Sequence, residues 1–236
     1  MGASIGDVRV LAFDTFGTLT DWHSGVASVA AQVLPDVDAE LLAREWRTRY
    51  APILARVESG DLPWENFDPL HRRTLADTAD ALGITVDDAA ASHLVGVWRR
   101  LPAWPDVVDG LTRLKTRFTI TPLSNGNVAL LSDMAKHNGF PWDFIGGADL
   151  WRHYKPSSAL YLGIAELFEV PPEQVMMVAT HQNDLDAARA NGLRTAFIER
   201  PLEWGGAPKD DSGSPHNDLH ARDVGPLADQ LLSAAT

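Results

Sequence analysis

The carboxylate of Asp14 stands at the end of a short apolar run, Val8–Phe13, which predicts a buried β-strand. Ligands of open α/β sheets bind in the crevice beyond the carboxyl ends of the strands. A carboxylate in that crevice can act as a nucleophile. Gly17 permits a sharp turn directly afterwards. We therefore predict that Asp14 is a nucleophile, although an aspartate after a strand also commonly caps a turn.

Three later polar stretches also stand where a predicted strand or loop ends. Ser124-Asn125-Gly126 offers hydrogen-bond donors to an anion, although the same residues are ordinary in turns. Lys155 precedes a predicted helix and could neutralise both Asp14 and a bound anion, or could simply be solvated. Thr180–Asp184 follows another strand, and the dipole of the next helix favours a carboxylate at Asp184.

The elements that would position these residues fall into two groups. From residue 21 to about 100 the sequence predicts helices and no convincing strand, with Asp38 as a candidate N-cap. Gly60-Asp61-Leu62-Pro63 interrupts the helical period, and Pro69 is a candidate kink. The expected helices cover residues 24–34, 39–56, 64–82 and 86–99.

From residue 105 onward, predicted strands and helices alternate, which is typical of βαβ units around a parallel sheet covered on both faces. Gly192 is the expected stop of one helix, and the composition of residues 203–223 predicts a surface loop. Strands are expected at 118–123, 143–145, 175–178 and 194–198, and helices at 107–115, 127–137, 156–168, 182–191 and 226–233.

Composition narrows the function classes. The 236 residues are 45% hydrophobic, which suffices for one core with a modest insert. The absence of cysteine excludes disulfides, thiolate catalysis and Cys-ligated zinc. A net charge of −12 without a basic stripe argues against nucleic-acid partners, and an anionic substrate would need local cations. With no signal pattern at the N-terminus and no apolar run of membrane length, we expect a cytoplasmic protein without membrane partners.

The order of Asp14, Ser124, Lys155 and Asp184 at strand ends resembles the four motifs of the haloacid dehalogenase superfamily. The resemblance covers the chain from Val8 to about Pro201. It implies an α/β fold with a Rossmann-like, doubly wound parallel sheet core and a helical cap inserted after the first strand. We expect the core at residues 1–20 and 101–236, and the cap at 21–100.

Most of that superfamily are magnesium phosphatases, which carry a general-acid aspartate two residues after the nucleophile. Here that position is Phe16, which cannot transfer a proton. One magnesium-binding carboxylate of those enzymes falls on Thr180, so that Asp184 alone remains of the pair. A magnesium phosphatase or phosphonate hydrolase is therefore disfavoured, and we expect neither a metal nor a cofactor. His216 and His220 have a spacing that can bind metal on a helix, but their turn-like surroundings favour a solvated loop.

The remaining pattern resembles the L-2-haloacid dehalogenase branch, which needs no metal and has an aromatic residue at the position of Phe16. In that branch a Trp-Arg pair in the cap supplies the arginine that holds the departing halide, and Trp46-Arg47 matches it. Arg44 and Arg49 are nearby competitors for this role. Tyr161 matches another site residue of the branch.

Thr180 and His181 depart from the pattern of the branch. His181 could hydrogen-bond Lys155 or Asp14, shape the pocket, or be an ordinary loop residue. A second rival to the dehalogenase is a non-catalytic binding protein of the same fold. The joint presence of Asp14, Lys155, Asp184 and Arg47 argues against it.

The resemblance implies hydrolysis of a short 2-haloalkanoic acid to the 2-hydroxy acid, with inversion, through an aspartyl ester on Asp14. Lys155 would favour the ionised carboxylate, and Thr18 would orient it. Arg47 and Asn125 would stabilise the departing halide, fluoride included among the candidates. Ser124 and backbone amides would bind the substrate carboxylate, and Asp184 would place or deprotonate water.

The expected catalytic residues are Asp14, Thr18, Arg47, Ser124, Asn125, Lys155 and Asp184. The expected substrate contacts are Thr15, Phe16, Arg47, Ser124, Asn125, Tyr161, Thr180 and His181. Phe16, Trp22 and Trp104 are candidates to exclude water around the halogen, and a homodimer is a further expectation from the family.

Overall fold

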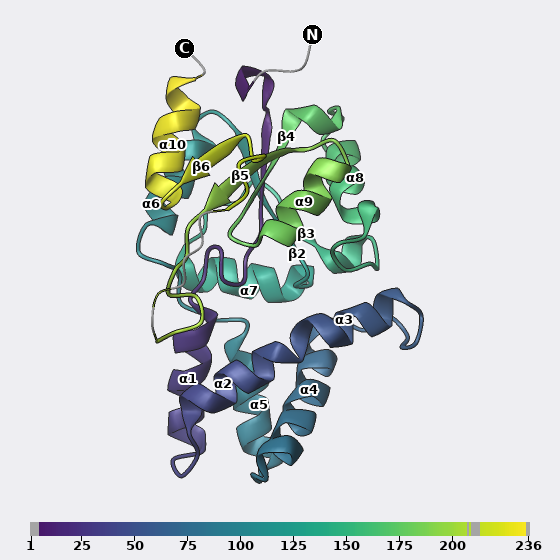
Figure 1. Ribbon diagram of the computed structural model, residues 1–236, viewed down its shortest axis with the longest axis vertical. Coiled ribbons are helices and arrows are strands. Elements are labelled where there is room, and N and C mark those ends of the chain that lie inside the picture. Colours follow the sequence, from purple (N-terminus) through teal and green to yellow (C-terminus); the bar gives the residue numbers. More distant parts are fainter. Residues whose placement is uncertain (1–4, 207, 209–212, 235–236) are drawn as a thin grey trace.

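A six-stranded parallel sheet in the order β3-β2-β1-β4-β5-β6 forms the centre of the computed structural model (Figure 1). The structure describes residues 5–206, 208 and 213–234. Strand β1 lies between β2 and β4 and is buried along its whole length, which explains its uninterrupted apolar sequence. The strands are β1 (Val10–Phe13), β2 (Thr119–Ser124), β3 (Gly146–Gly147), β4 (Val175–Ala179), β5 (Arg194–Ile198) and β6 (Leu219–Ala221).

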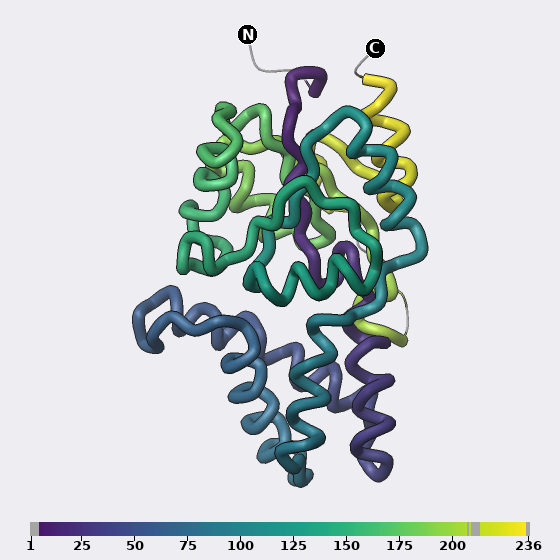
Figure 2. The backbone as a smooth tube through the Cα atoms, turned by 180° about the vertical axis from the view of Figure 1, so that it is seen from behind, coloured from purple at the N-terminus to yellow at the C-terminus, as the bar shows by residue number. Residues whose placement is uncertain are grey.

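Helices cover both faces of the sheet, as Figures 1 and 2 show from opposite sides. Helices α6, α7 and α10 lie on one face, and α8 and α9 lie on the other. This arrangement confirms the predicted α/β class with a doubly wound parallel sheet. The bounds are α6 (Val107–Lys115), α7 (Val128–Asn138), α8 (Ser158–Leu167), α9 (Gln182–Ala190) and α10 (Val224–Ser233), with short 3-10 turns at Ile5–Asp7, Ala148–Leu150 and Pro172–Gln174.

Five helices form a separate bundle beyond the carboxyl ends of the strands (Figure 1). Asp38 caps one of them by accepting a hydrogen bond from the backbone N–H of Leu41 at 3.0 Å, as predicted. We propose the expected division into a core at 1–20 and 101–236 and a cap at 21–100; residues 1–4, 207, 209–212 and 235–236 lie outside the described part. The bundle contains α1 (Trp22–Val33), α2 (Ala39–Thr48), α3 (Tyr50–Glu58), α4 (Phe67–Leu82) and α5 (Asp88–Val97).

The predicted long helix at 39–56 is wrong: two helices, α2 and α3, meet at Arg49. Pro52 gives the physical reason, because in a continuous helix its ring would clash with the carbonyl of Thr48. The predicted kink at Pro69 is also absent from α4. That helix begins at Phe67, so the proline stands in its first turn, where the missing N–H costs no hydrogen bond.

Two expectations for the sheet also fail. The strand predicted at 143–145 is displaced to Gly146–Gly147, which pairs with the end of β2. A Cβ on Gly146 would lie 2.5 Å from the Pro122 carbonyl oxygen, so this close pairing requires glycine. The stretch 203–223 is not wholly a loop, because it contains β6, which pairs with β5. Its residues 207 and 209–212 lie outside the described part.

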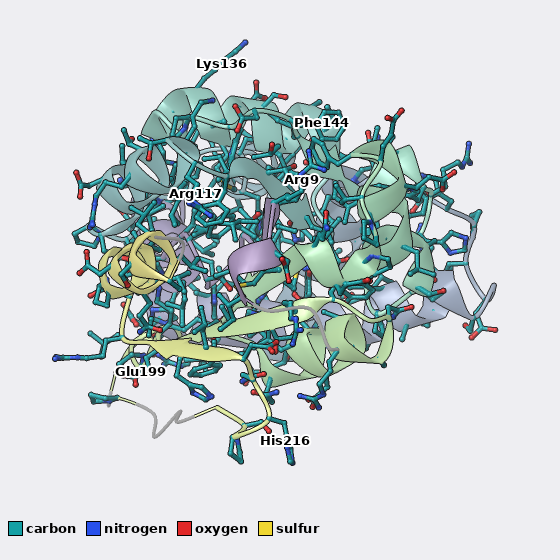
Figure 3. The ribbon with its side chains drawn as sticks, turned by 90° about the horizontal axis from the view of Figure 1, so that it is seen from above. Arg9, Arg117, Lys136, Phe144, Glu199 and His216 are labelled. Atoms are coloured by element: carbon teal, nitrogen blue, oxygen red, sulfur yellow. The ribbon has the colours of Figure 1, made fainter. Side chains whose placement is uncertain are left out.

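The two histidines considered as a metal pair do not share a helix. His216 lies in a peripheral turn (Figure 3), and His220 belongs to β6 with its Nε2 2.9 Å from the Ser214 carbonyl oxygen. Within the described ranges, no group of three or more His, Asp or Glu side chains could hold a metal ion. Among the described helices, none is long and apolar enough to cross a membrane.

Candidate active site

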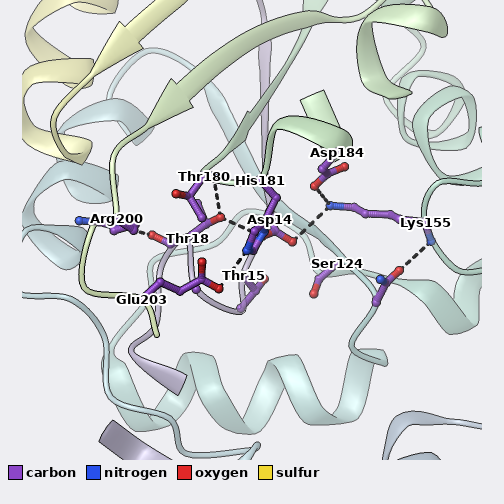
Figure 4. Close-up of polar contacts among 12 residues, drawn as sticks. Asp14, Thr15, Thr18, Ser124, Lys155, Thr180, His181, Asp184, Arg200 and Glu203 are labelled. Carbon is purple, nitrogen blue, oxygen red and sulfur yellow. Dashed lines mark hydrogen bonds and ion pairs between the residues drawn. The ribbon is translucent and has the colours of Figure 1, made fainter. Parts of the chain in front are cut away.

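Asp14 is the first residue after β1, and its carboxylate is held from one side by a fixed donor. The hydroxyl of Thr18 accepts the backbone N–H of Thr180 at 3.0 Å, so its own proton points to Asp14 Oδ2 at 2.8 Å (Figure 4). Asp14 itself is 8% exposed. The turn that follows β1 therefore presents one almost buried carboxylate in a defined orientation.

Lys155 joins this carboxylate to a second one. Its ammonium lies 3.4 Å from Asp14 Oδ1 and 2.6 Å from Asp184 Oδ2, and the Tyr161 hydroxyl donates to Asp184 Oδ1 at 2.7 Å. Asp184 stands in the first turn of α9, as predicted. Four side chains from three separate parts of the sequence thus form one polar network.

The environments of the two carboxylates push their pKa values apart. Burial disfavours the charged form of Asp14, but the charges of Lys155 and His181 outweigh it and hold the pKa of Asp14 well below its ordinary value. Burial raises the pKa of Asp184, and the Asp14 charge adds to this effect although Lys155 opposes it. An ionised Asp14 suits nucleophilic attack, and a less acidic Asp184 suits proton transfer.

His181 also contacts Asp14, and its ring connects Asp14 to Glu203, a residue that was not predicted from the sequence. Its Nδ1 lies 3.0 Å from Asp14 Oδ2, which realises one of the predicted options, and its Nε2 lies 3.0 Å from Glu203 Oε1. Glu203 is 4% exposed and accepts a further hydrogen bond from Trp22 Nε1 at 2.9 Å. Glu203 falls in the stretch predicted as a surface loop, and it carries no local sequence signal for a buried role.

The arginine of the Trp46-Arg47 pair faces the same region from the cap. The Arg47 guanidinium carbon lies 4.2 Å from the centre of the Tyr50 ring and 5.3 Å from that of Trp22. Arg47 is 8% exposed, and its Nη1 has no hydrogen-bond partner among the described residues. Its two competitors are engaged elsewhere. Arg44 contacts Glu40 and His23, and Arg49 donates to Thr78.

A cavity of about 600 Å³ lies between cap and core and brings these groups together. Asn125 stands at this boundary: its side-chain amide donates to the Tyr50 hydroxyl at 2.9 Å, and its Oδ1 accepts the backbone N–H of Lys155 at 2.7 Å. The cavity wall contains Asp14, Phe16, Arg47, Tyr50, Asn125, Lys155, Tyr161, His181, Asn183, Asp184 and Trp204, with Thr48, Ala51, Leu54, Ala55, Glu58 and Pro156 further along it.

Three predicted substrate contacts do not line this cavity in the part of the chain that the structure describes. Thr15, Ser124 and Thr180 are almost fully buried beside Asp14 (Figure 4). The Ser124 hydroxyl accepts the backbone N–H of Gly126 at 3.2 Å, whereas the hydroxyls of Thr15 and Thr180 have no partner among the described residues.

Of the aromatic residues expected to exclude water around the halogen, Phe16 lines the cavity and Trp104 does not. Phe16 lines the cavity and stacks on Phe67, with ring centres 5.2 Å apart. Trp104 lies outside it, because its indole N–H donates to the Gly17 carbonyl at 2.8 Å behind the turn. Trp204 lines the cavity instead and packs edge-on against Trp22. Trp22 does not line the cavity, but its ring contacts the Arg47 guanidinium.

The residues do not fit a magnesium site of the kind the superfamily's phosphatases use. Thr180 supplies a hydroxyl where those phosphatases have a magnesium-binding carboxylate, and Phe16 supplies a buried ring where they have the general acid. The remaining acid, Asp184, already accepts hydrogen bonds from Lys155 and Tyr161 on both of its oxygens. We therefore derive no step of the chemistry through a metal ion.

Comparison with known proteins places the chain among enzymes. The family model of haloacid dehalogenase-like hydrolases matches residues 8–192. A solved structure of a defluorinating L-2-haloacid dehalogenase is 42% identical, with a TM-score of 0.92 over 95% of each chain. (S)-2-haloacid dehalogenase 4A of Burkholderia cepacia is 28% identical over 86% of this chain and 90% of its own. Phosphoglycolate phosphatase 1 of Pseudomonas aeruginosa is also 28% identical, over 94% of this chain and 80% of its own.

Proposed function

Since the chain belongs to the haloacid dehalogenase-like hydrolases, we propose that it hydrolyses the carbon–halogen bond of a short 2-haloalkanoic acid. The products are the 2-hydroxy acid and halide. The observation that carries the proposal is that an ionised Asp14 and the guanidinium of Arg47 line one cavity, and that Arg47 Nη1 has no hydrogen-bond partner among the described residues. A nucleophile and an anion-binding cation on one cavity are what displacement of a halide needs.

In the first step Asp14 Oδ1 attacks the carbon that bears the halogen, and the carbon–halogen bond breaks as the ester bond forms. Oδ2 already accepts hydrogen bonds from Thr18 and His181, whereas Oδ1 has a longer contact of 3.4 Å with Lys155. Oδ1 therefore keeps a lone pair for attack. Arg47 and Asn125 stabilise the negative charge that grows on the halide.

In the second step water attacks the carboxyl carbon of the Asp14 ester. The bond between that carbon and Oδ1 breaks, and Oδ1 leaves as the hydroxyl oxygen of the product. One water proton goes to this hydroxyl, by way of Asp184, and the other is released to solvent when Asp14 ionises again. The raised pKa of Asp184 suits this transfer.

In this proposal the substrate carboxylate contacts the backbone amides that follow Asp14, because Ser124 is fully buried outside the cavity wall. Lys155 balances the charge of Asp14 and of the incoming anion. The defluorinating relative supports fluoride among the leaving groups. The similarity to a phosphoglycolate phosphatase makes phosphate-ester hydrolysis the rival function. Phe16 argues against it, because it occupies the position where those phosphatases have their general acid.

A single turnover in water labelled with heavy oxygen tests the ester directly. With the enzyme in excess over 2-chloropropionate, the label is expected in the peptide that contains Asp14 and not in the product hydroxyl. Label in the product hydroxyl during the first turnover would show direct attack by water and would overturn the proposal.

A further inference from the structure

The imidazole of His181 bridges two carboxylates. Its Nδ1 lies 3.0 Å from Asp14 Oδ2, and its Nε2 lies 3.0 Å from Glu203 Oε1. Because both ring nitrogens face carboxylate oxygens, both are satisfied when each carries a proton. The ring is thereby presented to Asp14 as a cationic hydrogen-bond donor.

Glu203 is itself held in place by several buried contacts. Trp22 Nε1 donates to Oε1 at 2.9 Å, and the carboxylate lies directly over Gly17, where an added Cβ would approach Oε1 to 2.3 Å. Arg200 anchors the same segment by donating to the Thr18 carbonyl at 2.8 Å and to both oxygens of Asp106. Figure 4 shows Arg200 and Glu203 on the same side of Asp14 as Thr18. This part of the chain therefore serves to fix the orientation of His181.

Asp14 Oδ2 is the oxygen that accepts the hydrogen bond from His181. In the proposed function the other oxygen, Oδ1, attacks the substrate. After Oδ1 has bonded to the substrate carbon, Oδ2 is the carbonyl oxygen of the ester. It still faces Thr18 Oγ1 at 2.8 Å and His181 Nδ1 at 3.0 Å. Two donors on one ester carbonyl oxygen form the geometry of an oxyanion hole.

We propose that His181, oriented by Glu203, acts with Thr18 as the oxyanion hole for hydrolysis of the Asp14 ester. This inference rests on the proposed function and assigns His181 a catalytic role in its second step. Water adds to the carboxyl carbon, and the electron pair of the carbonyl bond moves onto Oδ2. When that pair returns, the bond to Oδ1 breaks, and His181 keeps its proton throughout.

The charges around His181 support a donor rather than a base. Burial alone would favour the neutral ring, but the charges of Glu203 and Asp14 raise the pKa of His181 to about 10. Two cations lie nearby, Lys155 beside Asp14 and Arg47 near Glu203. They do not reverse the rise in the pKa of His181. Ester formation removes the Asp14 charge, so the pKa falls during the reaction, while Glu203 continues to favour the protonated ring.

The test separates the two steps by rapid mixing with 2-chloropropionate, measuring released halide and, by intact mass, the covalent adduct. In His181→Ala, a halide burst of one equivalent is expected to persist while ester hydrolysis slows by ~10²-fold or more, so that the adduct accumulates. His181→Asn places an amide N–H near the former Nδ1 and is expected to restore part of the rate. His93→Ala, which changes an exposed histidine of α5, is the matched control and is expected to behave as wild type.

Two results would overturn the inference. One is ester hydrolysis in His181→Ala at the wild-type rate, and the other is His181→Asn no faster than His181→Ala, because an amide can donate but cannot act as a base. Failure of the proposed function looks different, since wild type itself would then release no halide and form no adduct. Circular dichroism of each variant establishes that it has folded.

The pH profile gives a second readout. A donor that must be protonated predicts a rate of ester hydrolysis that falls as the pH rises, with a midpoint below about 10. If His181 instead acted as a general base, the rate of ester hydrolysis would fall as the pH decreases through the pKa of His181. Glu203→Gln, which removes the positioning charge, is expected to move the midpoint to lower pH; an unmoved midpoint would contradict the role of Glu203.

Discussion

Lys155 stands closer to Asp184 than to Asp14, with 2.6 Å between its ammonium and Asp184 Oδ2 and 3.4 Å to Asp14 Oδ1. Its strongest contact is therefore with the carboxylate proposed to handle water, not with the proposed nucleophile. Because its contact with Lys155 is longer, Asp14 Oδ1 is held less tightly and has a lone pair available for attack. Tyr161 completes the environment of Asp184 by donating to its other oxygen at 2.7 Å.

Tyr161→Phe is expected to move the acidic limb of the rate of ester hydrolysis to higher pH. The Tyr161 hydrogen bond favours the charged carboxylate, so its loss raises the pKa of Asp184 further. A hydrogen bond to a charged group contributes about 1.5–3 kcal/mol, which corresponds to a shift of about one to two pH units. The measurement is the single-turnover rate between about pH 4 and pH 9. Tyr154→Phe is the matched control, because that hydroxyl donates to the Glu65 carbonyl; an equal shift in both variants would contradict the assignment.

Arg47→Ala is expected to slow the halide burst by ~10²-fold or more, because it removes the cation proposed to stabilise the departing halide. Arg47 Nη1 has no hydrogen-bond partner among the described residues, so the loss of stability should come mainly from the packing of the guanidinium on Tyr50 and Trp22. We expect the melting temperature to change much less than the burst rate. The burst rate and the melting temperature are measured together. Arg44→Ala, from the same helix and bonded to Glu40, serves as the control. A burst rate as fast in Arg47→Ala as in Arg44→Ala would assign the halide site to another residue.

Gly17→Ala is expected to destabilise the protein by more than about 1 kcal/mol. Gly17 has a φ of +90°, and an added Cβ would lie 2.3 Å from Glu203 Oε1. Gly83→Ala isolates the backbone cost, because Gly83 has a φ of +65° with no atom within 4 Å of the added Cβ among the described residues. Chemical denaturation should show the larger loss for Gly17→Ala. Equal losses would mean that Glu203 moves aside at no cost.

The stability contributed by His181 is expected to depend on pH. Its pKa is raised from 6.5 to about 10 in the folded state, so its contribution is complete below about pH 6.5 and is lost as the pH rises through about 10. The difference in unfolding free energy between wild type and His181→Asn should therefore shrink from about pH 6 to about pH 10. A difference that stays constant over this range would show that the ring is not ionised in the folded protein.

The sequence predicted those features that depend on local pattern. The apolar run before Asp14, the alternation after residue 105 and the helical period of the cap all gave elements of the right kind. Their order also placed Asp14, Asn125, Lys155 and Asp184 on one cavity. Asp14 and Asn125 follow strands, Asp184 lies in the first turn of α9 and Lys155 lies shortly before α8, so the topology brings them together.

Features that depend on long-range packing were not predictable in this way. Strand β3 consists of two glycines without β propensity, held by backbone pairing with β2. Glu203 lies in a polar, glycine-rich stretch, and its burial depends on Trp22, Gly17 and His181. The break between α2 and α3 at Arg49 is a different case, because Pro52 could have predicted it. The single helix was predicted instead because the apolar residues on both sides of Arg49 follow one helical period.

Halide release is the measurement that tests the central claim most directly. Chloroacetate, fluoroacetate and each enantiomer of 2-chloropropionate are supplied to wild type and to Asp14→Asn, with EDTA present throughout. We expect wild type to release halide despite the chelator and Asp14→Asn to lose at least ~10³-fold in rate. No halide from any substrate, together with hydrolysis of p-nitrophenyl phosphate once magnesium is added, would contradict the account and support a phosphatase.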